Sequence, residues 1–319
     1  MMVALALLLG AGILGWFAPG RLRALGSTGV DSAALLLAWA VAGLTVLASA
    51  VTAVGVLVIP SHGSKDGVPS ALHGCWDALA HGTVPRAEQI AGLGGAALLG
   101  VLTVRVLVVF GSSTLRRRRA RDKHLSSLRI ATTRRPGDPR TWWLDHAHPV
   151  AFSLAGYPGV VVASDGLRDR LTDREVSAVL AHEYAHLRGR HHLLIAWFDA
   201  LAKALPFVPL FREALQVVRG LAEQSADACA ARTYGPDVVC SALVAMAAAG
   251  CAAPGDALAM AQGSIEVRLD RLTRKYGGGG LVRRSVHFGV AAALVAVAPL
   301  VVAGLALSAL AVLSCPLSG

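Results

Sequence analysis

Four long apolar runs constrain the fold of this chain more than any other feature. They are residues 2–19, 33–59, 89–110 and 287–313, each with few or no charges. A helix needs about 20 residues to cross a hydrocarbon core about 30 Å thick, and every run is near or above that length. Helices and closed barrels alone satisfy their backbone hydrogen bonds inside a bilayer. The sequence therefore predicts a mainly α, four-span helical membrane protein.

A polar stretch between the third and fourth runs has the length of one ordinary domain. We therefore predict three spans in residues 1–110, with an external loop at 60–88. Residues 111–285 form a cytoplasmic domain, and residues 286–319 hold the last span and a short external tail. The first run could instead be a cleaved signal peptide, but it lacks a basic start and a good cleavage site, so we expect a retained helix.

Lysine and arginine set the predicted orientation, because cytoplasmic loops carry an excess of both. The basic clusters are residues 116–123, Arg21 with Arg23, and Arg283 with Arg284. The loop 60–88 is nearly balanced in charge. We therefore expect a multi-pass protein of the cell membrane, with its N-terminus outside and residues 111–285 in the cytoplasm.

The formal net charge of +10 does not predict nucleic-acid binding. Much of the excess is the block 116–123, which follows the third run directly. A basic cluster in that position attracts anionic lipid headgroups. No recognition motif follows it, so we expect the lipid bilayer as a partner and no direct contact with nucleic acid.

Residues 182–186 read His-Glu-Tyr-Ala-His. Positions i and i+4 share one face of a helix, so His182 and His186 can direct imidazole nitrogens at one metal ion. Glu183 lies beside them and can take a proton from a metal-bound water. The pattern is typical of a zinc peptidase with Glu183 as the catalytic base. The alternative is a pair of ordinary surface histidines on a charged helix.

A third ligand is available in residues 223–227, which read Glu-Gln-Ser-Ala-Asp in another helical stretch. Two histidines and a distant glutamate hold a catalytic zinc with one position open for water. The sequence thus predicts one Zn²⁺ per chain, bound by His182, His186 and Glu223. Asp227, one turn after Glu223, can hydrogen-bond a ligand histidine. Its alternative role is a solvated residue or a salt-bridge partner.

Local signals predict the elements around the motif. Residues 149–163 mix β-branched residues with turn formers and predict two short strands around a turn at 157–159. Thr172 and Glu175 form a capping box, which begins a helix that ends near Arg190. His191 and His192 follow with the wrong spacing to share a face with His186. We expect both at the surface or the membrane interface.

The remaining stretch predicts three more helices. Residues 193–211 are apolar but interrupted, and predict a buried or membrane-grazing helix that ends before Pro206. A helix from about 209 to 233 is stopped by Gly235. Residues 264–276 predict an amphipathic helix, and the glycines 277–280 predict a linker.

The five cysteines divide between the two predicted sides of the membrane. Cys229, Cys240 and Cys251 fall in the cytoplasmic domain, where thiols stay reduced. Cys75 and Cys315 fall outside, where oxidation favours a bridge between them; two unpaired thiols are the alternative.

These motifs resemble those of the membrane gluzincin peptidases. The residues that carry the resemblance are 152–156, 162–167 and 178–192, within a matched stretch of roughly 145–275. Two branches fit: the BlaR/MecR-type signal transducers, whose cytoplasmic domain cuts a transcriptional repressor, and the HtpX-type quality-control proteases. The resemblance implies a cytoplasmic α+β zincin-like metallopeptidase domain with zinc on His182, His186 and Glu223. It also implies that residues 151–155 form the edge strand that pairs with substrate backbone.

The number of spans and the basic flanks resemble the transducer branch more. That branch carries an external penicillin-binding domain after its last span, with a Ser-x-x-Lys nucleophile. We find neither outside the membrane in these 319 residues and expect no covalent β-lactam sensing.

Three functions remain open: cleavage of a cytoplasmic protein such as a DNA-binding repressor, quality control of membrane proteins, and a catalytically silent receptor or scaffold. Arg232 and Tyr234 are candidate oxyanion donors for the first two.

Overall fold

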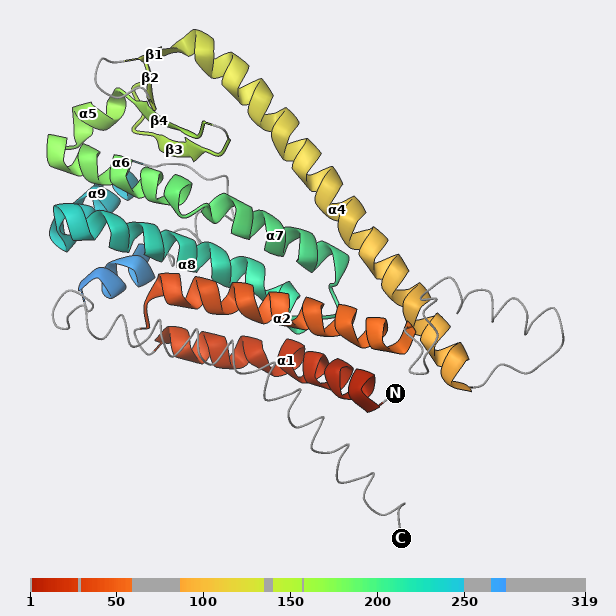
Figure 1. Ribbon diagram of the computed structural model, residues 1–319. Coiled ribbons are helices and arrows are strands. Elements are labelled where there is room, and N and C mark those ends of the chain that lie inside the picture. The colour runs from red at the N-terminus through yellow and green to blue at the C-terminus, as the bar shows by residue number, and fades with distance from the viewer. Residues whose placement is uncertain are drawn as a thin grey trace.

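A computed structural model describes residues 2–27, 30–58, 87–134, 140–156, 158–249 and 265–273. The fold is mostly helical with one small sheet (Figure 1). The helices are α1 (Met2–Ser27), α2 (Ser32–Val58), α4 (Ala87–Ala131), α5 (Gly166–Arg170), α6 (Asp173–Arg188), α7 (His191–Ala204), α8 (Pro209–Tyr234), α9 (Pro236–Ala248) and a short helix at 265–273. The strands are β1 (Thr132–Arg134), β2 (Thr141–Leu144), β3 (Ala151–Leu154) and β4 (Val160–Ser164).

The largest apolar core joins the N-terminal helices to the second half of the chain. Trp39 of α2 is fully buried against Phe198 of α7, with ring centroids 6.4 Å apart in an edge-to-face arrangement. Phe211 and Val218 of α8 are fully buried in the same cluster. Burial of large aromatic side chains contributes strongly to stability, so α1, α2, α7 and α8 form one packed bundle.

The helix α4 is 45 residues long and runs from the third apolar run through the basic block to β1. It packs on α2 and α7. Arg117 donates to Asp199 of α7 at 2.7 Å, and Lys203 donates to the same carboxylate at 2.8 Å. The predicted boundary at residue 111 therefore lies inside a continuous helix.

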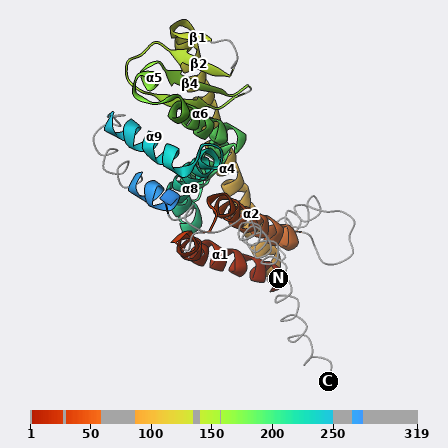
Figure 2. The ribbon, with the colours of Figure 1, turned by 90° about the vertical axis from the view of Figure 1, so that its left-hand side faces the viewer.

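The four strands lie in the order β1-β2-β4-β3, with only the β2–β4 pair parallel. Every residue of β4 is buried, because Val160–Ser164 is covered by the helices and by its neighbours. The strand β3 pairs with β4 on one side and forms an edge of the sheet. Figure 2 shows the sheet and the α1–α2 hairpin at opposite ends of the molecule, with α6, α8 and α9 between them.

Several local predictions are confirmed. Thr172 accepts from the backbone of Glu175, whose side chain returns to the Thr172 N–H, so the capping box begins α6. β3 and β4 flank the predicted turn. The helix α7 ends at Ala204, before Pro206, and α8 extends one residue beyond the predicted 233.

Other elements were not predicted, namely β1, β2, α5 and α9. The first two strands are short and follow a basic stretch without alternation, so their pairing depends on tertiary contacts. Among the described helices, one segment, Ser32–Val54, is long and apolar enough to cross a membrane. The run 287–313, the linker 277–280, the Cys75–Cys315 bridge and the predicted loop up to residue 86 lie outside the described residues, and residues 87 and 88 of that loop begin α4.

Packing of α2 on α7 generates a stability prediction at Gly43. A Cβ atom at this position would lie 2.8 Å from Cη2 of Trp197, whereas a Cβ at Gly12 of α1 would meet nothing within 4 Å. We expect Gly43→Ala to destabilise the fold by about 1–3 kcal/mol through overpacking. Gly12→Ala is the matched control and should stabilise α1 by about 0.5–1 kcal/mol, since alanine is the better helix former. Thermal unfolding in detergent measures both, and equal midpoints for the two variants would contradict the packing.

Candidate metal centre

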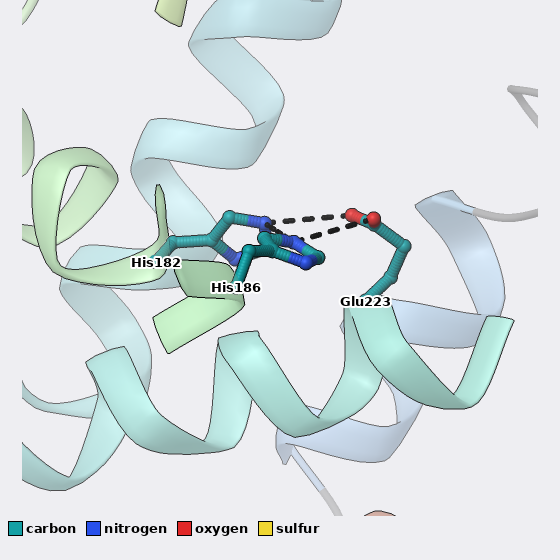
Figure 3. Close-up of side chains that lie close together, drawn as sticks. All are labelled: His182, His186 and Glu223. Carbon is teal, nitrogen blue, oxygen red and sulfur yellow. Dashed lines mark hydrogen bonds and ion pairs between the residues drawn. The ribbon is translucent and has the colours of Figure 1, made fainter. Parts of the chain in front are cut away.

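The helix α6 places the two histidines of the pentapeptide one turn apart. Nε2 of His182 and Nε2 of His186 lie 3.1 Å from each other. Both side chains are mostly buried, with 13% and 15% of their surface exposed. Figure 3 shows both imidazoles directed toward Glu223 of α8. The predicted i, i+4 pair is thus present on one helix face.

Glu223 completes a group that can hold a metal ion. Its carboxylate oxygens lie 3.4 Å from Nε2 of His182 and 3.4 Å from Nε2 of His186. A tetrahedral zinc with bonds of about 2.0–2.1 Å sets its ligand atoms about 3.3 Å apart. The two Nε2 atoms, 3.1 Å apart, are near this spacing, and each lies 3.4 Å from a different oxygen of Glu223, Oε2 for His182 and Oε1 for His186. One ligand atom from each of the three residues lies within 4.8 Å of the others, so the three residues can reach one ion. The donor set of two imidazoles and one carboxylate also fits zinc.

Asp227 fixes the orientation of the first histidine. Its Oδ1 lies 2.9 Å from Nδ1 of His182, and only 3% of the Asp227 side chain is exposed. A carboxylate at Nδ1 holds the proton on that nitrogen and leaves the Nε2 lone pair for a metal. Asp227 is therefore not a solvated residue: it contacts His182 as the predicted orienting role requires, and it is also a salt-bridge partner of Arg268.

Arg268 supports both carboxylates from the helix 265–273. It donates to Asp227 through Nε at 2.6 Å and Nη2 at 2.7 Å, and its Nη1 lies 3.5 Å from Glu223. A bidentate guanidinium–carboxylate pair is strong and directional. Arg268 was not predicted, because an arginine on an amphipathic helix 41 residues away carries no signal of its partner.

The prediction for His191 is wrong. This residue is 6% exposed, and its Nδ1 lies 3.1 Å from Nδ1 of His186. Arg190 adopts a left-handed φ of 49°, which turns the chain back so that His191 lies against the end of α6. If Nε2 of His186 faces a metal, its Nδ1–H donates to Nδ1 of His191. Spacing along one helix face could not reveal this contact, since the turn breaks the helix.

Glu183 lies at the open edge of the sheet. Its carboxylate hydrogen-bonds with the side chain and the backbone of Ser153 in β3. The Ser164 N–H donates to the Val150 carbonyl, and in an antiparallel pair every second residue then directs its backbone groups to the partner strand. The backbone N–H and carbonyl of Ser153 therefore point away from β4, toward the open edge of the sheet. Burial raises the pKa of Glu183, and the charge of His182 and the bonds from Ser153 offset part of the rise. A raised pKa suits a general base.

Burial and neighbouring charges shift the pKa values of the residues in this cluster. Burial opposes a positive charge on His182, but hydrogen bonds with Asp227 and Glu223 prevail and raise its pKa to about 9. Burial likewise opposes ionisation of Glu223, but His182 and Arg268 lower its pKa to about 2. Burial lowers the pKa of His186 to about 4, so this imidazole is neutral at pH 7. A metal at Nε2 of His182 must displace a proton, and its binding therefore weakens as the pH falls.

The two candidate oxyanion donors do not lie at this site. Arg232 is exposed, and Tyr234 packs at the end of α8 against the α6–α9 cluster. They follow Glu223 by nine and eleven residues, which is about 14 and 16 Å along a helix. Neither side chain is placed to contact a substrate held by the three ligand atoms.

Comparison with known proteins supports a metallopeptidase domain. Residues 118–253 match the sequence pattern of peptidase family M48. Two curated relatives, both named Protease HtpX homolog, from Ralstonia nicotianae and Ralstonia pickettii, are 35% identical over 69 residues. This segment is 21% of the present chain and 24% of each relative, so the match spans about a quarter of the relatives' length. No solved structure matches the chain.

The ligand geometry predicts different losses for the two carboxylates of α8. Glu223→Ala should abolish zinc binding, because one of the three donors disappears. Asp227→Ala should weaken zinc binding about 10–100-fold, the usual range for a residue that orients a ligand. Zinc content after dialysis against graded chelator measures both. Loss of zinc in Asp227→Ala with retention in Glu223→Ala would reverse the assignment.

The contact between His191 and His186 predicts a second effect on metal affinity. His191→Ala should lower zinc affinity about 10–100-fold by releasing the His186 ring. His191→Asn should restore part of it, since the amide oxygen can accept near the position of Nδ1. His192→Ala is the matched control and should bind zinc as the wild type does. Equal affinities for all three variants would exclude the positioning role.

Proposed function

We propose that this chain is a membrane-embedded, zinc-dependent endopeptidase that cleaves a cytoplasmic protein. One observation carries the proposal: one donor atom from each of His182, His186 and Glu223 lies within 4.8 Å of the others, and Glu183 follows His182 on α6. The similarity to peptidase family M48 supports the same reaction class. His182, His186 and Glu223 would hold the zinc, and Asp227 and His191 would orient its histidines.

The proposed reaction is general-base hydrolysis of a peptide bond. When bound, zinc supplies Lewis acidity and lowers the pKa of a coordinated water from 15.7 to about 7. Glu183 accepts the proton of the attacking water and passes it to the leaving amine. Its burial raises its pKa toward the working pH, which favours both transfers.

The edge of the sheet suits an extended substrate. The strand β3 is the edge of the sheet, and a peptide can add to such an edge as a further strand. The backbone of Ser153 at this edge is bonded to Glu183 in the free protein, so a bound peptide would share this position with the base. Glu183 contacts this edge at Ser153, so a peptide bound along β3 passes beside the base. Backbone pairing would give affinity without a strict sequence requirement.

The proposed setting is a four-span membrane protein with residues 111–285 on the cytoplasmic side. The apolar helix Ser32–Val54 and the shared core of α2 with α7 and α8 support a catalytic unit attached to the membrane. Two substrate classes fit: a DNA-binding repressor, as in the transducer branch, and damaged membrane proteins, as in HtpX-type quality control. The similarity to proteins named Protease HtpX homolog supports the second class, and the number of apolar runs with their basic flanks supports the first.

A catalytically silent receptor or scaffold is the remaining alternative. A scaffold could keep a structural metal, but such a site usually has four protein ligands and no adjacent base. The described cluster brings three donor atoms together and places Glu183 beside them. This donor count favours an enzyme.

Removal of the base tests the proposed reaction. Glu183→Gln should keep zinc, because the ligand set is intact, and should lose at least about 10²-fold in proteolysis. Glu266→Gln is the matched control, since Glu266 is exposed on the helix 265–273. Zinc content and casein digestion are measured on the purified protein in detergent. Wild-type cleavage by the zinc-loaded Glu183→Gln variant would exclude the mechanism.

The same variant can distinguish the two substrate classes. A protease without its base retains substrates, so Glu183→Gln can be cross-linked in cells and its captured proteins identified by mass spectrometry. Enrichment of a DNA-binding protein over the Glu223→Ala variant supports the signalling role. Enrichment of membrane proteins supports quality control.

A further inference from the structure

The turn between α7 and α8 carries an apolar tip remote from the metal centre. Phe207 exposes 61% of its surface, and Pro206 beside it is exposed as well. Leu205 and Leu210 on either side are buried. A single exposed phenylalanine needs no explanation in itself. Its position relative to the N-terminal helices, however, indicates how deep the turn lies relative to the proposed spans.

Contacts place this turn beside α1 and α4, two of the three helices proposed to span the membrane. On α1, a Cβ added at Gly15 would lie 3.1 Å from Cγ1 of Val208. On α4, Arg105 donates from Nη2 to the carbonyl of Lys203 at 3.3 Å. The third helix, α2, contacts α7 eight residues before the turn, where Gly43 faces Trp197. Figure 1 shows the start of α8 beside α2, and the two helices pack on each other.

The contacts on α1 and α4 give similar depths for the turn. The first apolar run ends at residue 19, so Gly15 lies four residues, or about 6 Å, inside its cytoplasmic end. The third run ends at residue 110, so Arg105 lies five residues, or about 7.5 Å, inside the same edge. Interfacial elements bury their apolar faces about 5–10 Å into the boundary between headgroups and acyl chains. The turn falls in that range.

Charged side chains lie on the cytoplasmic side of the turn, a few residues from its tip. Arg23 of α1 pairs with Glu213 of α8 at 2.9 Å. Glu213 follows Val208 by five residues, which is about 7.5 Å along α8 toward the cytoplasm. Arg212 beside it is 63% exposed. The change from apolar to charged side chains along α8 therefore coincides with the cytoplasmic edge set by the spans.

We propose that the α7–α8 hairpin is a second membrane contact of this chain, with residues 205–208 immersed in the cytoplasmic leaflet and Phe207 against the acyl chains. This inference rests on the membrane topology in the proposed function. Arg23, Lys203 and Arg212 then lie at the headgroups, where long basic side chains are favourable. The hairpin fixes the height of the catalytic unit because it is covalently continuous with both α6 and Glu223.

A fixed distance between the metal centre and the membrane determines which segment of a membrane-anchored substrate can reach the site. Glu223 follows Val208 by fifteen residues, so the metal centre lies about 22 Å along α8 from the turn. With the turn about 6 Å deep, the site stands up to about 16 Å above the hydrocarbon edge. An extended chain covers about 3.3 Å per residue, so a membrane-anchored substrate must extend about five residues beyond its span. The substrate class is thus cytoplasmic segments near the membrane, not the spans themselves.

Nitroxide labels in proteoliposomes test the immersion. Single cysteines replace Phe207, Leu44 of α2 and Val244 of α9 in a variant without the native cysteines. All three positions are exposed large apolar residues. Oxygen collides more with a label in lipid, and a water-soluble nickel chelate collides more with a label in water. We expect Phe207 to behave like Leu44 and opposite to Val244.

The outcomes separate the anchor from the topology. If Leu44 reports lipid and Phe207 reports water, the hairpin anchor is wrong while the spans stand. If Leu44 also reports water, the proposed spans are wrong and the anchor fails with them.

Anchored substrates test the height. A single-span protein carries one cleavable segment placed either about two or about ten extended residues beyond its span, which is about 7 or 33 Å. In proteoliposomes we expect cleavage of the long spacer and loss of cleavage with the short one. Equal cleavage of both would overturn the fixed height, and casein digestion by the same preparation confirms that the enzyme is active.

Discussion

The metal centre depends on the close approach of α6 to α8. Small side chains line this contact: Ala178 of α6 and Ala230 and Ala231 of α8 are almost fully buried in one cluster. Short side chains let two helix axes approach to the lower end of the usual 8–10 Å. Only then can donors from α6 and α8 converge within 4.8 Å of one another. Enlarging an alanine here would separate the ligands before it disturbed any of them directly.

A third element, the helix 265–273, also supports the metal centre through buried charges. Asp227 is nearly inaccessible and is satisfied by His182 on one side and Arg268 on the other. A buried carboxylate without its partner is strongly destabilising, so the helix 265–273 is needed to complete the centre. Arg271, one turn along that helix, donates to the carbonyl of Gly26 at the end of α1 and to that of Val30 just before α2. The metal centre and the N-terminal hairpin thus share one supporting helix.

Sequence patterns predicted the parts of this site that follow a helical period. His182 with His186, and Glu223 with Asp227, are i, i+4 pairs, and α6 begins at a recognisable capping box. Convergence of those two faces was a hypothesis, because no local signal gives the register between two helices. Arg268, His191 and Ser153 were missed for the same reason. Each reaches the site across a turn or from a separate element, where spacing carries no information.

Hydropathy alone also could not distinguish apolar residues that pack in the protein core from apolar residues that face lipid. The helix α2 has 27 residues, about 40 Å, which exceeds a hydrocarbon core of about 30 Å. One side of the helix is apolar for another reason: Leu35, Trp39, Ala42 and Val46 are buried in the core shared with α7 and α8. Leu37, Leu44 and Val51 are exposed, as lipid-facing residues would be. The same apolar run therefore provides protein core with some of its residues and a candidate lipid contact with others, which is how the catalytic unit can be joined to the bilayer without a linker.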